Sequence, residues 1–297
     1  MAILFYHAGA LGDFITALPA MRTYRSRRAG APAVLLGRPE HGPLAAMAGA
    51  ADETWDAANP RFASLYAGSP DPALAAAFSR FDSALLFASG ASRLPAGLRA
   101  AGARGITVQE PFPSGRTPIV EHHLSLFPDA GPGDRSVSFA YREDVVRRSR
   151  LLMGEGERPV AIHPGSGGPR KMWPLGRFAD LASRLSEAGR AVAWIAGPAE
   201  ETLALPRGGL HWKNEGLAVL AHLLSRSALF VGNDSGVAHL AAAAGCPVVA
   251  LFGASDPIVW APNGRKVRVV AAAGGMESID VDEVYDACVA MLENQGR

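Results

Sequence analysis

The segment at 232–236, Gly-Asn-Asp-Ser-Gly, has the residue types of an anion-binding turn. It follows a short apolar run typical of a buried strand and leads into a small-residue stretch at 235–244 that favours a helix. The unpaired N–H groups and the dipole at the start of a helix attract a phosphate or a carboxylate. Gly236 lets a ligand approach the backbone, and His239 lies one turn further along, on the side of Ser235. The spacing therefore predicts an anion site.

A second glycine-rich loop, His-Pro-Gly-Ser-Gly-Gly-Pro-Arg-Lys-Met-Trp at 163–173, also follows an apolar run. Such a loop can wrap phosphate oxygens with backbone N–H groups, including that of Gly167, and with the hydroxyl of Ser166. Lys171 adds a mobile positive charge, and Arg170 adds a second. The P-loop spacing is absent, which disfavours a P-loop nucleotide-binding protein, and the GxGxxG spacing is absent, which disfavours a nicotinamide oxidoreductase. An ordinary surface turn is the alternative, but the second anion-binding turn at the same sheet edge favours phosphate.

The elements that must position these loops form an alternating pattern of short apolar runs and helical stretches, which indicates parallel sheets with crossover helices. In the first half we expect strands at 3–6, 33–36, 84–87 and 106–109. The helix after the first strand either starts late, near Thr16, or is kinked at Pro19. In the second half we expect strands at 159–163, 191–196, 228–231 and 247–252, and helices at 175–188, 216–224 and 235–244. In such sheets ligands bind beyond the carboxyl ends of the strands, where both loops lie.

The length of the chain and a break in the pattern around 131–135 predict two Rossmann-like, doubly wound α/β domains. We place the boundary near residue 155, with an N-terminal domain at 1–154 and a C-terminal domain at 155–297. A final helix is expected at 281–292, where it can pack back on the N-terminal domain.

Composition excludes several classes of protein. A formal net charge of +1 gives no support for nucleic-acid binding. Cys246 and Cys288 are too few for a disulfide framework or a cysteine-based metal site, and they fit a reducing compartment. No histidine grouping has metal-ligand spacing, so the histidines at 7, 122–123 and 163 are expected to be structural or solvent-facing. The apolar N-terminus lacks the basic region of a signal peptide, and no segment has the length of a membrane span, so we expect a cytoplasmic protein.

Three segments resemble glycosyltransferase family 9, the ADP-heptose:lipopolysaccharide heptosyltransferases. They are GALGDFITALPAMR at 9–22, HPGSGGPRKMWPLGRFADLASRL at 163–185 and GNDSGVAHLAAAAGCPVVALFG at 232–253. The resemblance implies a GT-B architecture, in which two Rossmann-like domains face a cleft. It places the acceptor on the N-terminal domain and a sugar nucleotide, with adenine as its base, on the C-terminal one. It also implies an inverting transfer that needs no metal ion and no other cofactor.

Asp13 matches the family's acidic residue that is thought to be the general base for the acceptor hydroxyl. The alternative is a helix cap, which is common after a glycine turn. A helix N-terminus keeps a carboxylate ionised but lowers its basicity, although a positioned carboxylate can still assist proton transfer. We favour the base. Lys171 matches the lysine expected to neutralise the diphosphate as negative charge builds on that leaving group.

The remaining site residues follow from the same motifs. Ser166 is expected to donate to the phosphates. The turn at 234–236 matches the family's D-S/T-G, whose N–H groups meet the diphosphate while Asp234 holds sugar hydroxyls or caps the helix. His239 is expected to support the loop or the sugar. Glu200 lies where the family has an acidic residue that accepts hydrogen bonds from the ribose hydroxyls of the nucleotide. Glu201 is the alternative candidate for this role.

The N-terminal domain between 40 and 120 matches little of the family, which leaves the acceptor open between a lipopolysaccharide core and another glycan. A lipid-linked acceptor implies a peripheral contact with the cytoplasmic face of the inner membrane. We predict a glycosyltransferase that uses a nucleotide-diphosphate sugar. Two alternatives remain open. An epimerase or hydrolase of the same fold would turn over the donor alone, and a non-catalytic sugar-nucleotide or glycan-binding protein would give no product.

Overall fold

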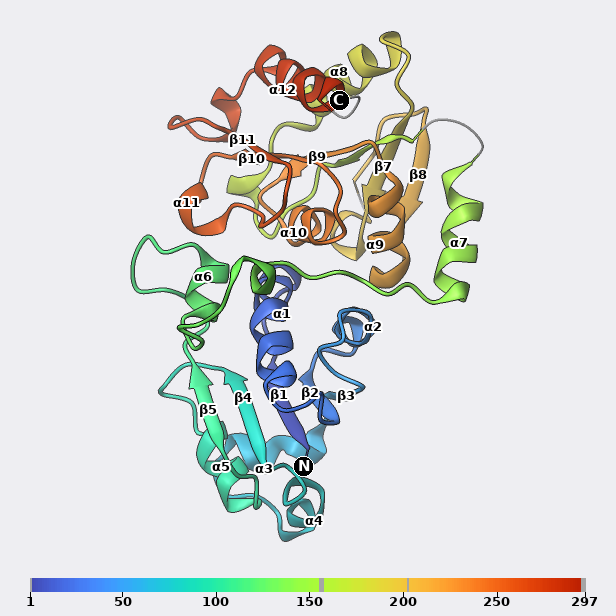
Figure 1. The fold of residues 1–297 in the computed structure, drawn as a ribbon. Helices are drawn as coiled ribbons and strands as arrows, with labels where there is room; N and C mark the ends of the chain where they lie inside the picture. Colours follow the sequence, from blue (N-terminus) through green and yellow to red (C-terminus); the bar gives the residue numbers. More distant parts are fainter. Residues whose placement is uncertain (1, 155–157, 202, 295–297) are drawn as a thin grey trace. The chain divides into compact units, whose positions relative to one another are not determined.

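The structure, a computed structural model, describes residues 2–154, 158–201 and 203–294. The chain forms two compact units, Met1–Ala140 and Tyr141–Arg297, which run from blue to green and from green to red in Figure 1. The predicted boundary near residue 155 falls in a stretch outside the described residues.

The two units divide earlier than that boundary because helix α7 (Glu143–Met153) belongs to the second unit. This helix packs against α9 (Leu217–Arg226). Just before it, the hydroxyl of Tyr141 donates to the carbonyl of Ala221 at 3.2 Å. The sequence of α7 is amphipathic but does not itself specify which helix covers its apolar face.

The first unit contains a five-stranded parallel sheet with the strand order β3-β2-β1-β4-β5. The strands are β1 (Ile3–His7), β2 (Ala33–Gly37), β3 (Glu53–Asp56), β4 (Ser83–Phe87) and β5 (Ile106–Gln109). The helices are α1 (Leu11–Ser26), α2 (Gly42–Met47), α3 (Ala63–Tyr66), α4 (Ala75–Phe78), α5 (Leu94–Ala100) and α6 (Ile119–Leu124), with short 3-10 turns η1 (Pro39–His41), η2 (Pro60–Phe62), η3 (Pro72–Leu74) and η4 (Pro132–Arg135). The four predicted strands are present, and β3 is an additional edge strand.

The two faces of this sheet pack against different helices, as the alternation of side chains along a strand requires. Leu4 on β1 belongs to the apolar cluster that includes Leu65 of α3 and Leu98 of α5. Its neighbour Phe5 meets the ring of Tyr24 on α1, with ring centroids 5.8 Å apart. Helix α1 also packs against α6. Both faces of the sheet are therefore covered.

Helix α1 begins at Leu11 and runs through Pro19, so the expected late start near Thr16 is wrong. Proline lacks the N–H group for one helical hydrogen bond. Burial offsets that loss, since Ile15, Leu18 and Met21 are all buried.

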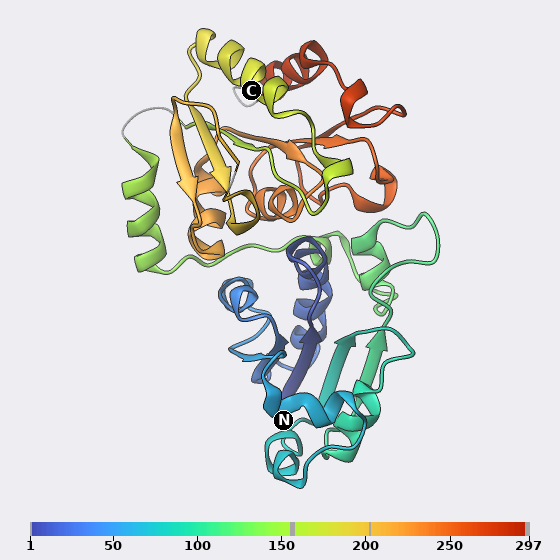
Figure 2. The ribbon, with the colours of Figure 1, turned by 180° about the vertical axis from the view of Figure 1, so that it is seen from behind.

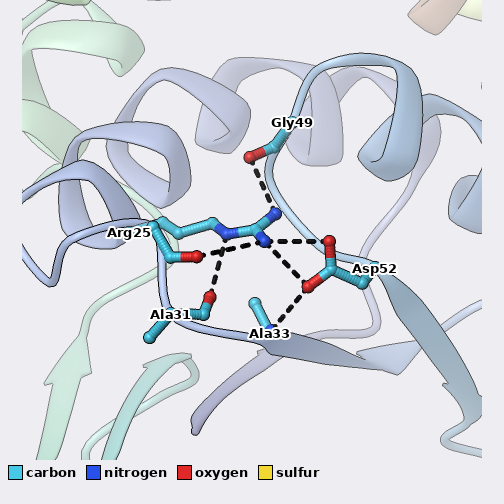
Figure 3. A network of polar contacts seen from close by, with 6 residues as sticks. Arg25, Ala31, Ala33, Gly49 and Asp52 are labelled. Atoms are coloured by element: carbon cyan, nitrogen blue, oxygen red, sulfur yellow. Dashed lines mark hydrogen bonds and ion pairs between the residues drawn. The ribbon is translucent and has the colours of Figure 1, made fainter. Parts of the chain in front are cut away.

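The C-terminal end of α1 is held by Arg25, as Figure 3 shows. Its guanidinium donates to the carbonyls of Ala31 at 3.0 Å and Gly49 at 3.2 Å, and to both carboxylate oxygens of Asp52 at 2.8 Å. One of these oxygens also accepts the N–H of Ala33 at 2.9 Å. Because Asp52 and Ala33 flank the starts of β3 and β2, this network fixes the helix against the sheet.

The second unit contains a six-stranded parallel sheet with the strand order β11-β10-β9-β6-β7-β8. The strands are β6 (Val160–His163), β7 (Val192–Ala196), β8 (Leu210–Lys213), β9 (Leu229–Asn233), β10 (Val248–Phe252) and β11 (Val267–Ala271). The helices besides α7 and α9 are α8 (Leu175–Glu187), α10 (Gly236–Ala243), α11 (Pro257–Trp260) and α12 (Val281–Glu293), with 3-10 turns η5 (Pro169–Lys171), η6 (Pro198–Glu200) and η7 (Met276–Ser278). The predicted strands and helices of this half are all present.

Helices cover both faces of the second sheet, which Figures 1 and 2 show from opposite sides. Helices α8 and α12 pack on one face, and α9 and α10 pack on the other. The apolar side of α12, including Val284 and Cys288, lies in the same core cluster as Phe178 of α8. Helix α12 therefore packs within its own unit, and its expected packing on the N-terminal domain stays a prediction.

Candidate functional site

Strands β6, β9 and β10 of the second unit end at the same edge of the sheet. His163 pairs with Gly232, and Asn233 pairs with Leu251, so the loops after the three strands start at neighbouring positions. From β6 the chain continues outward to β7 and β8, and later from β9 to β10 and β11 in the opposite direction. The boundary between β6 and β9 is thus the point where the strand order reverses, which is the usual ligand-binding position in such sheets.

Side chains from all three loops meet at this point. The Nζ of Lys171 lies 2.6 Å from Oδ2 of Asp234, and the hydroxyl of Ser255 donates to the same oxygen. The Asp234 side chain is 8% exposed and that of Lys171 is 40% exposed, so the ammonium is the more accessible partner. Oδ1 of Asp234 accepts no hydrogen bond from a described residue. The ammonium keeps further N–H donors, and the carboxylate keeps one oxygen, for a ligand.

Ser255 was not selected from the sequence. It lies in Gly-Ala-Ser-Asp-Pro, directly after the predicted strand at 247–252, and this position was the available signal. The sequence alone did not reveal the strand order that places β10 next to β9 and brings Ser255 to Asp234.

Two further contacts hold the loops together. Asn233, which is fully buried, donates from Nδ2 to the carbonyl of Pro164 at 2.8 Å and accepts the N–H of Trp173 at 3.0 Å. It therefore holds both ends of the glycine-rich loop. Ser166 donates its hydroxyl to the carbonyl of Asp234 at 2.8 Å. The predicted donation from Ser166 to a phosphate requires it to release this contact, and stays a prediction.

The start of helix α10 offers backbone donors beside this cluster. Ser235 is its N-cap residue and accepts the N–H of Ala238 at 3.4 Å. The N–H groups of Gly236 and Val237 make no hydrogen bond within the described structure, as expected for the first turn of a helix. An anion at this position would receive both N–H groups and the favourable end of the helix dipole.

His239 is buried within α10, at 6% exposure. Burial lowers its pKa to about 4, while the Asp234 carboxylate raises it and the Lys171 ammonium lowers it. The ring is therefore neutral at neutral pH. This fits the supporting role expected for His239 rather than that of a proton donor.

Glu200, after β7, lies against the glycine-rich loop. Its Oε2 accepts the N–H of Gly197 at 2.8 Å and lies 3.6 Å from Nε2 of His163. The pKa of Glu200 is lowered chiefly by His163, against the opposing effect of burial, with the Gly197 N–H adding to the decrease. Glu201 is exposed. Of the two candidates for the ribose hydroxyls, Glu200 is the one that lies at the loop.

Gly165 and Gly167 differ in what surrounds them. A methyl group on Gly165 would lie 2.1 Å from Oε1 of Glu200, so this position must be glycine for Glu200 to keep its place. Gly167 has no neighbouring atom where a methyl group would lie. Its predicted role in backbone contact with a phosphate is left untested. Arg170, next to Lys171, is exposed.

Asp13 lies in the first unit, as the third residue of α1. Its Oδ2 accepts the N–H of Ala10, the residue before the helix, at 3.3 Å. A methyl group on Gly9 would lie 3.2 Å from the same oxygen, so the loop packs closely on the carboxylate. Ala10, not Asp13, is the N-cap residue, so the alternative interpretation of Asp13 as the helix cap is wrong; its carboxylate instead accepts the N–H of that cap residue from the first turn. This contact leaves the base role of Asp13 a prediction.

Buried histidines surround the first turns of α1. The ring of His41 stacks on Phe14 with centroids 4.4 Å apart, His7 meets Phe14 edge-on at 5.4 Å, and His123 Nδ1 lies 3.1 Å from the carbonyl of Thr16. Burial lowers the pKa of His7 to about 3, aided by His41 and His123, and it lowers the pKa of His41 to about 4. In both rings Nδ1 has no hydrogen-bond partner within the described structure. These rings are neutral packing groups.

The family model of glycosyltransferase family 9 (heptosyltransferase) matches residues 76–285, which is most of the chain.

The chain belongs to glycosyltransferase family 9.

The matched range contains the loops of Lys171, Asp234 and Ser255, whereas Asp13 lies before it.

Individual relatives support the family and the fold. Lipopolysaccharide heptosyltransferase 3 of Escherichia coli K12 is 32% identical over 161 residues, which are 49% of this chain and 47% of that protein. The chain spans about half the length of the curated relatives it matches. The structure of E. coli ADP-heptose lps heptosyltransferase II matches with a TM-score of 0.81 and 22% identity, over 100% of both chains. An E. coli heptosyltransferase with ADP-2-deoxy-2-fluoro heptose matches with a TM-score of 0.71 and 18% identity, over 98% of this chain and 99% of that one.

At these identities the structural matches show the fold alone. They confirm the predicted GT-B class for this family 9 member, with two doubly wound parallel-sheet α/β units. Within the part of the chain that the structure describes, no helix is both long and apolar enough to cross a membrane. No group of three or more His, Cys, Asp or Glu side chains that could hold a metal ion occurs among the described residues.

Proposed function

We propose that this family 9 member is an inverting, metal-independent glycosyltransferase that transfers a heptose from an ADP-linked donor to a glycan acceptor. The observation that carries the proposal is the cluster of Lys171, Asp234 and Ser255 at the start of α10. The solved relative with ADP-2-deoxy-2-fluoro heptose supports the donor. The names of the curated relatives support a lipopolysaccharide core as the acceptor.

In the proposed donor site the diphosphate lies over the start of α10. The N–H groups of Gly236 and Val237 and the ammonium of Lys171 bind its oxygens. The pairing with Asp234 holds the ammonium in place before the donor arrives, which reduces the cost of ordering a long side chain. The remaining oxygen of Asp234 accepts a hydrogen bond from a sugar hydroxyl, and Glu200 accepts hydrogen bonds from the ribose hydroxyls.

In the proposed reaction the acceptor hydroxyl oxygen attacks the anomeric carbon of the heptose. The new C–O bond forms on the face opposite the diphosphate, and the bond from the anomeric carbon to the phosphate oxygen breaks, which inverts the configuration. Asp13 takes the hydroxyl proton. The departing ADP gains negative charge in the transition state, so Lys171 and the helix N–H groups stabilise this state more than the bound donor.

Metal independence follows in this proposal from Lys171, which supplies the positive charge on the diphosphate. We expect the rate of transfer to be unchanged by EDTA. The measurement is the initial rate of ADP release with EDTA and with added Mg²⁺. A rate that falls with EDTA and returns with Mg²⁺ would contradict this part of the proposal.

The experiment that tests the function combines binding and turnover. Calorimetric titration of the full chain with ADP, UDP, GDP and CDP, without added metal, is expected to show selective binding of ADP that Lys171→Ala removes. Asp13→Asn is expected to abolish transfer from ADP-heptose to a glycan acceptor while leaving ADP affinity nearly unchanged. Asn keeps the size of the side chain, so loss of binding in this variant would instead indicate a structural cap.

The outcomes also separate the alternatives. Consumption of ADP-heptose without an acceptor would favour a hydrolase or an epimerase. Tight ADP binding with no product for any acceptor tested would favour a non-catalytic binding protein. Failure to bind any of the four diphosphates would overturn the donor site.

A further inference from the structure

A cavity of about 450 Å³ lies in the second unit, and no residue of the candidate-site loops lines it. Helix α7 contributes Ser149 and Arg150 to its lining, and α9 contributes His222 and Arg226, while Arg158 precedes β6. Its volume is in the range of small-molecule sites, about 300–1,000 Å³. No aspartate or glutamate lines it within the described ranges.

Among the described residues, the guanidinium groups of this cavity have no acidic partner. The side chains of Arg150 and Arg226 form no hydrogen bond or ion pair with any described residue. Arg158 donates to the carbonyls of Arg226 at 2.9 Å and Ser227 at 2.7 Å, which fixes its position, and it has no acidic partner within the described ranges. By contrast Arg148, on the same helix, pairs with a glutamate at 2.8 Å. The cavity therefore gathers positive charge that the described structure does not compensate.

His222 has a defined hydrogen-bonding state in this cavity. The hydroxyl of Ser149, which is fully buried, donates to the carbonyl of Val146 at 2.9 Å. Its oxygen therefore accepts the N–H of His222 Nδ1, at 2.5 Å. The lone pair of the neutral ring then lies on Nε2. Burial lowers the pKa of His222, and Arg226 and Arg150 lower it further, so both guanidinium groups are close enough to act on the ring.

We propose that this cavity binds a phosphate monoester group, carried by a small metabolite or by a lipid headgroup. Arg150 and Arg226 bind the phosphate oxygens, because a planar guanidinium matches phosphate with paired N–H donors. Arg158, held by the backbone, contributes its charge. Nε2 of His222 accepts a hydrogen bond from a hydroxyl group of the ligand. The site shares no residue with the proposed donor site, so it does not depend on the proposed function.

The test is a titration of the full chain with sn-glycerol 3-phosphate at constant ionic strength, followed by ³¹P NMR. The double variant R150Q/R226Q removes two charges at nearly constant side-chain length. R147Q is the matched control, because Arg147 lies on the same helix and does not line the cavity. Lys171→Ala removes the other expected phosphate-binding group. Thermal melting of each variant checks folding.

We expect glycerol 3-phosphate to bind the native chain, R147Q and Lys171→Ala with similar affinity, and R150Q/R226Q about tenfold or more weakly. Binding lost in Lys171→Ala and kept in R150Q/R226Q would overturn the proposal. Failure of glycerol 3-phosphate to bind the native chain would also overturn it. Sedimentation with phosphatidylcholine vesicles, with and without phosphatidic acid, assigns the source. Cosedimentation that R150Q/R226Q abolishes supports the site with a lipid headgroup, and binding of glycerol 3-phosphate without cosedimentation supports it with a free metabolite.

Discussion

Gly165→Ala tests whether Glu200 is held in place for a nucleotide. The added methyl group would lie 2.1 Å from Oε1 and 2.4 Å from Cδ of Glu200. Ordinary contacts between such atoms are about 3.5–4.0 Å, so the carboxylate must move by more than about 1 Å. That movement takes it from the Gly197 N–H at 2.8 Å and from His163. Because the obstacle is the end of a flexible side chain, we expect little loss of thermal stability.

The proposed contact of Glu200 with the ribose hydroxyls gives the size of the effect. Hydrogen bonds to a charged group contribute about 1.5–3 kcal/mol, which corresponds to about a ten- to hundredfold decrease in ADP affinity. We expect this decrease in Gly165→Ala and a similar one in Glu200→Ala. The assay is calorimetric titration with ADP, without added metal.

Two controls make the result specific. Gly168→Ala changes the same loop at a position with no atom near the added methyl group, and we expect it to bind ADP normally. In the Glu200→Ala background the obstacle is gone, so Gly165→Ala should cause no further loss. Equal losses from Gly165→Ala in both backgrounds would refute the reasoning, because the methyl group would then act on the loop and not through Glu200.

Further predictions concern the Asp234 cluster and the buried histidines. Ser255→Ala removes one of the two contacts on Oδ2 of Asp234, and we expect up to about a tenfold loss of ADP-heptose affinity. Ser255→Thr keeps the hydroxyl and should restore the affinity. If the Thr variant binds ADP-heptose as weakly as the Ala variant, the hydroxyl has no role in binding. Below about pH 6.5 the unfolded chain binds protons on His7 and His41 that the folded chain does not bind. The free energy of unfolding therefore decreases as the pH is lowered from 6.5 to 4, by up to about 1.4 kcal/mol per pH unit for each histidine. His41→Phe keeps the stacking on Phe14 and should reduce the slope of the unfolding free energy against pH by the contribution of one proton. The measurement is urea unfolding from pH 7 to 4, and hydrogen exchange assigns the change to the first unit. An unchanged slope would show that His41 does not contribute to it.

Much of the central fold could be predicted from the sequence because its signals are local. The buried strands β1, β4, β6, β9 and β10 are short apolar runs covered on both faces, and such runs stand out without knowledge of their neighbours. The edge strands β3, β8 and β11 were not predicted, whereas the edge strand β5 was. The residues of β3, β8 and β11 are mostly exposed or only partly buried, so these strands lack a continuous apolar run and depend on a neighbouring strand for their hydrogen bonds.

The same division applies to the candidate site. Lys171 and Asp234 belong to loops with glycine spacing and helix-start residues, which are properties of consecutive residues. Their 2.6 Å contact depends on β9 lying next to β6, although sixty-odd residues separate the loops in the chain. Both units were predicted to have carboxyl-end loops that carry chemistry, and Asp13 lies in the first turn of the helix that follows such a loop.

Ser255, Asn233 and the pairing of Gly165 with Glu200 were decided by tertiary structure alone. Ser255 joins the cluster because β10 pairs with β9, and Gly165 meets Glu200 because β7 pairs with β6. Strand order and register arise from contacts between distant residues, and no pattern of neighbouring side chains specifies them. The sequence by itself therefore determined which loops could bind an anion, while the order of the strands decided which side chains meet there.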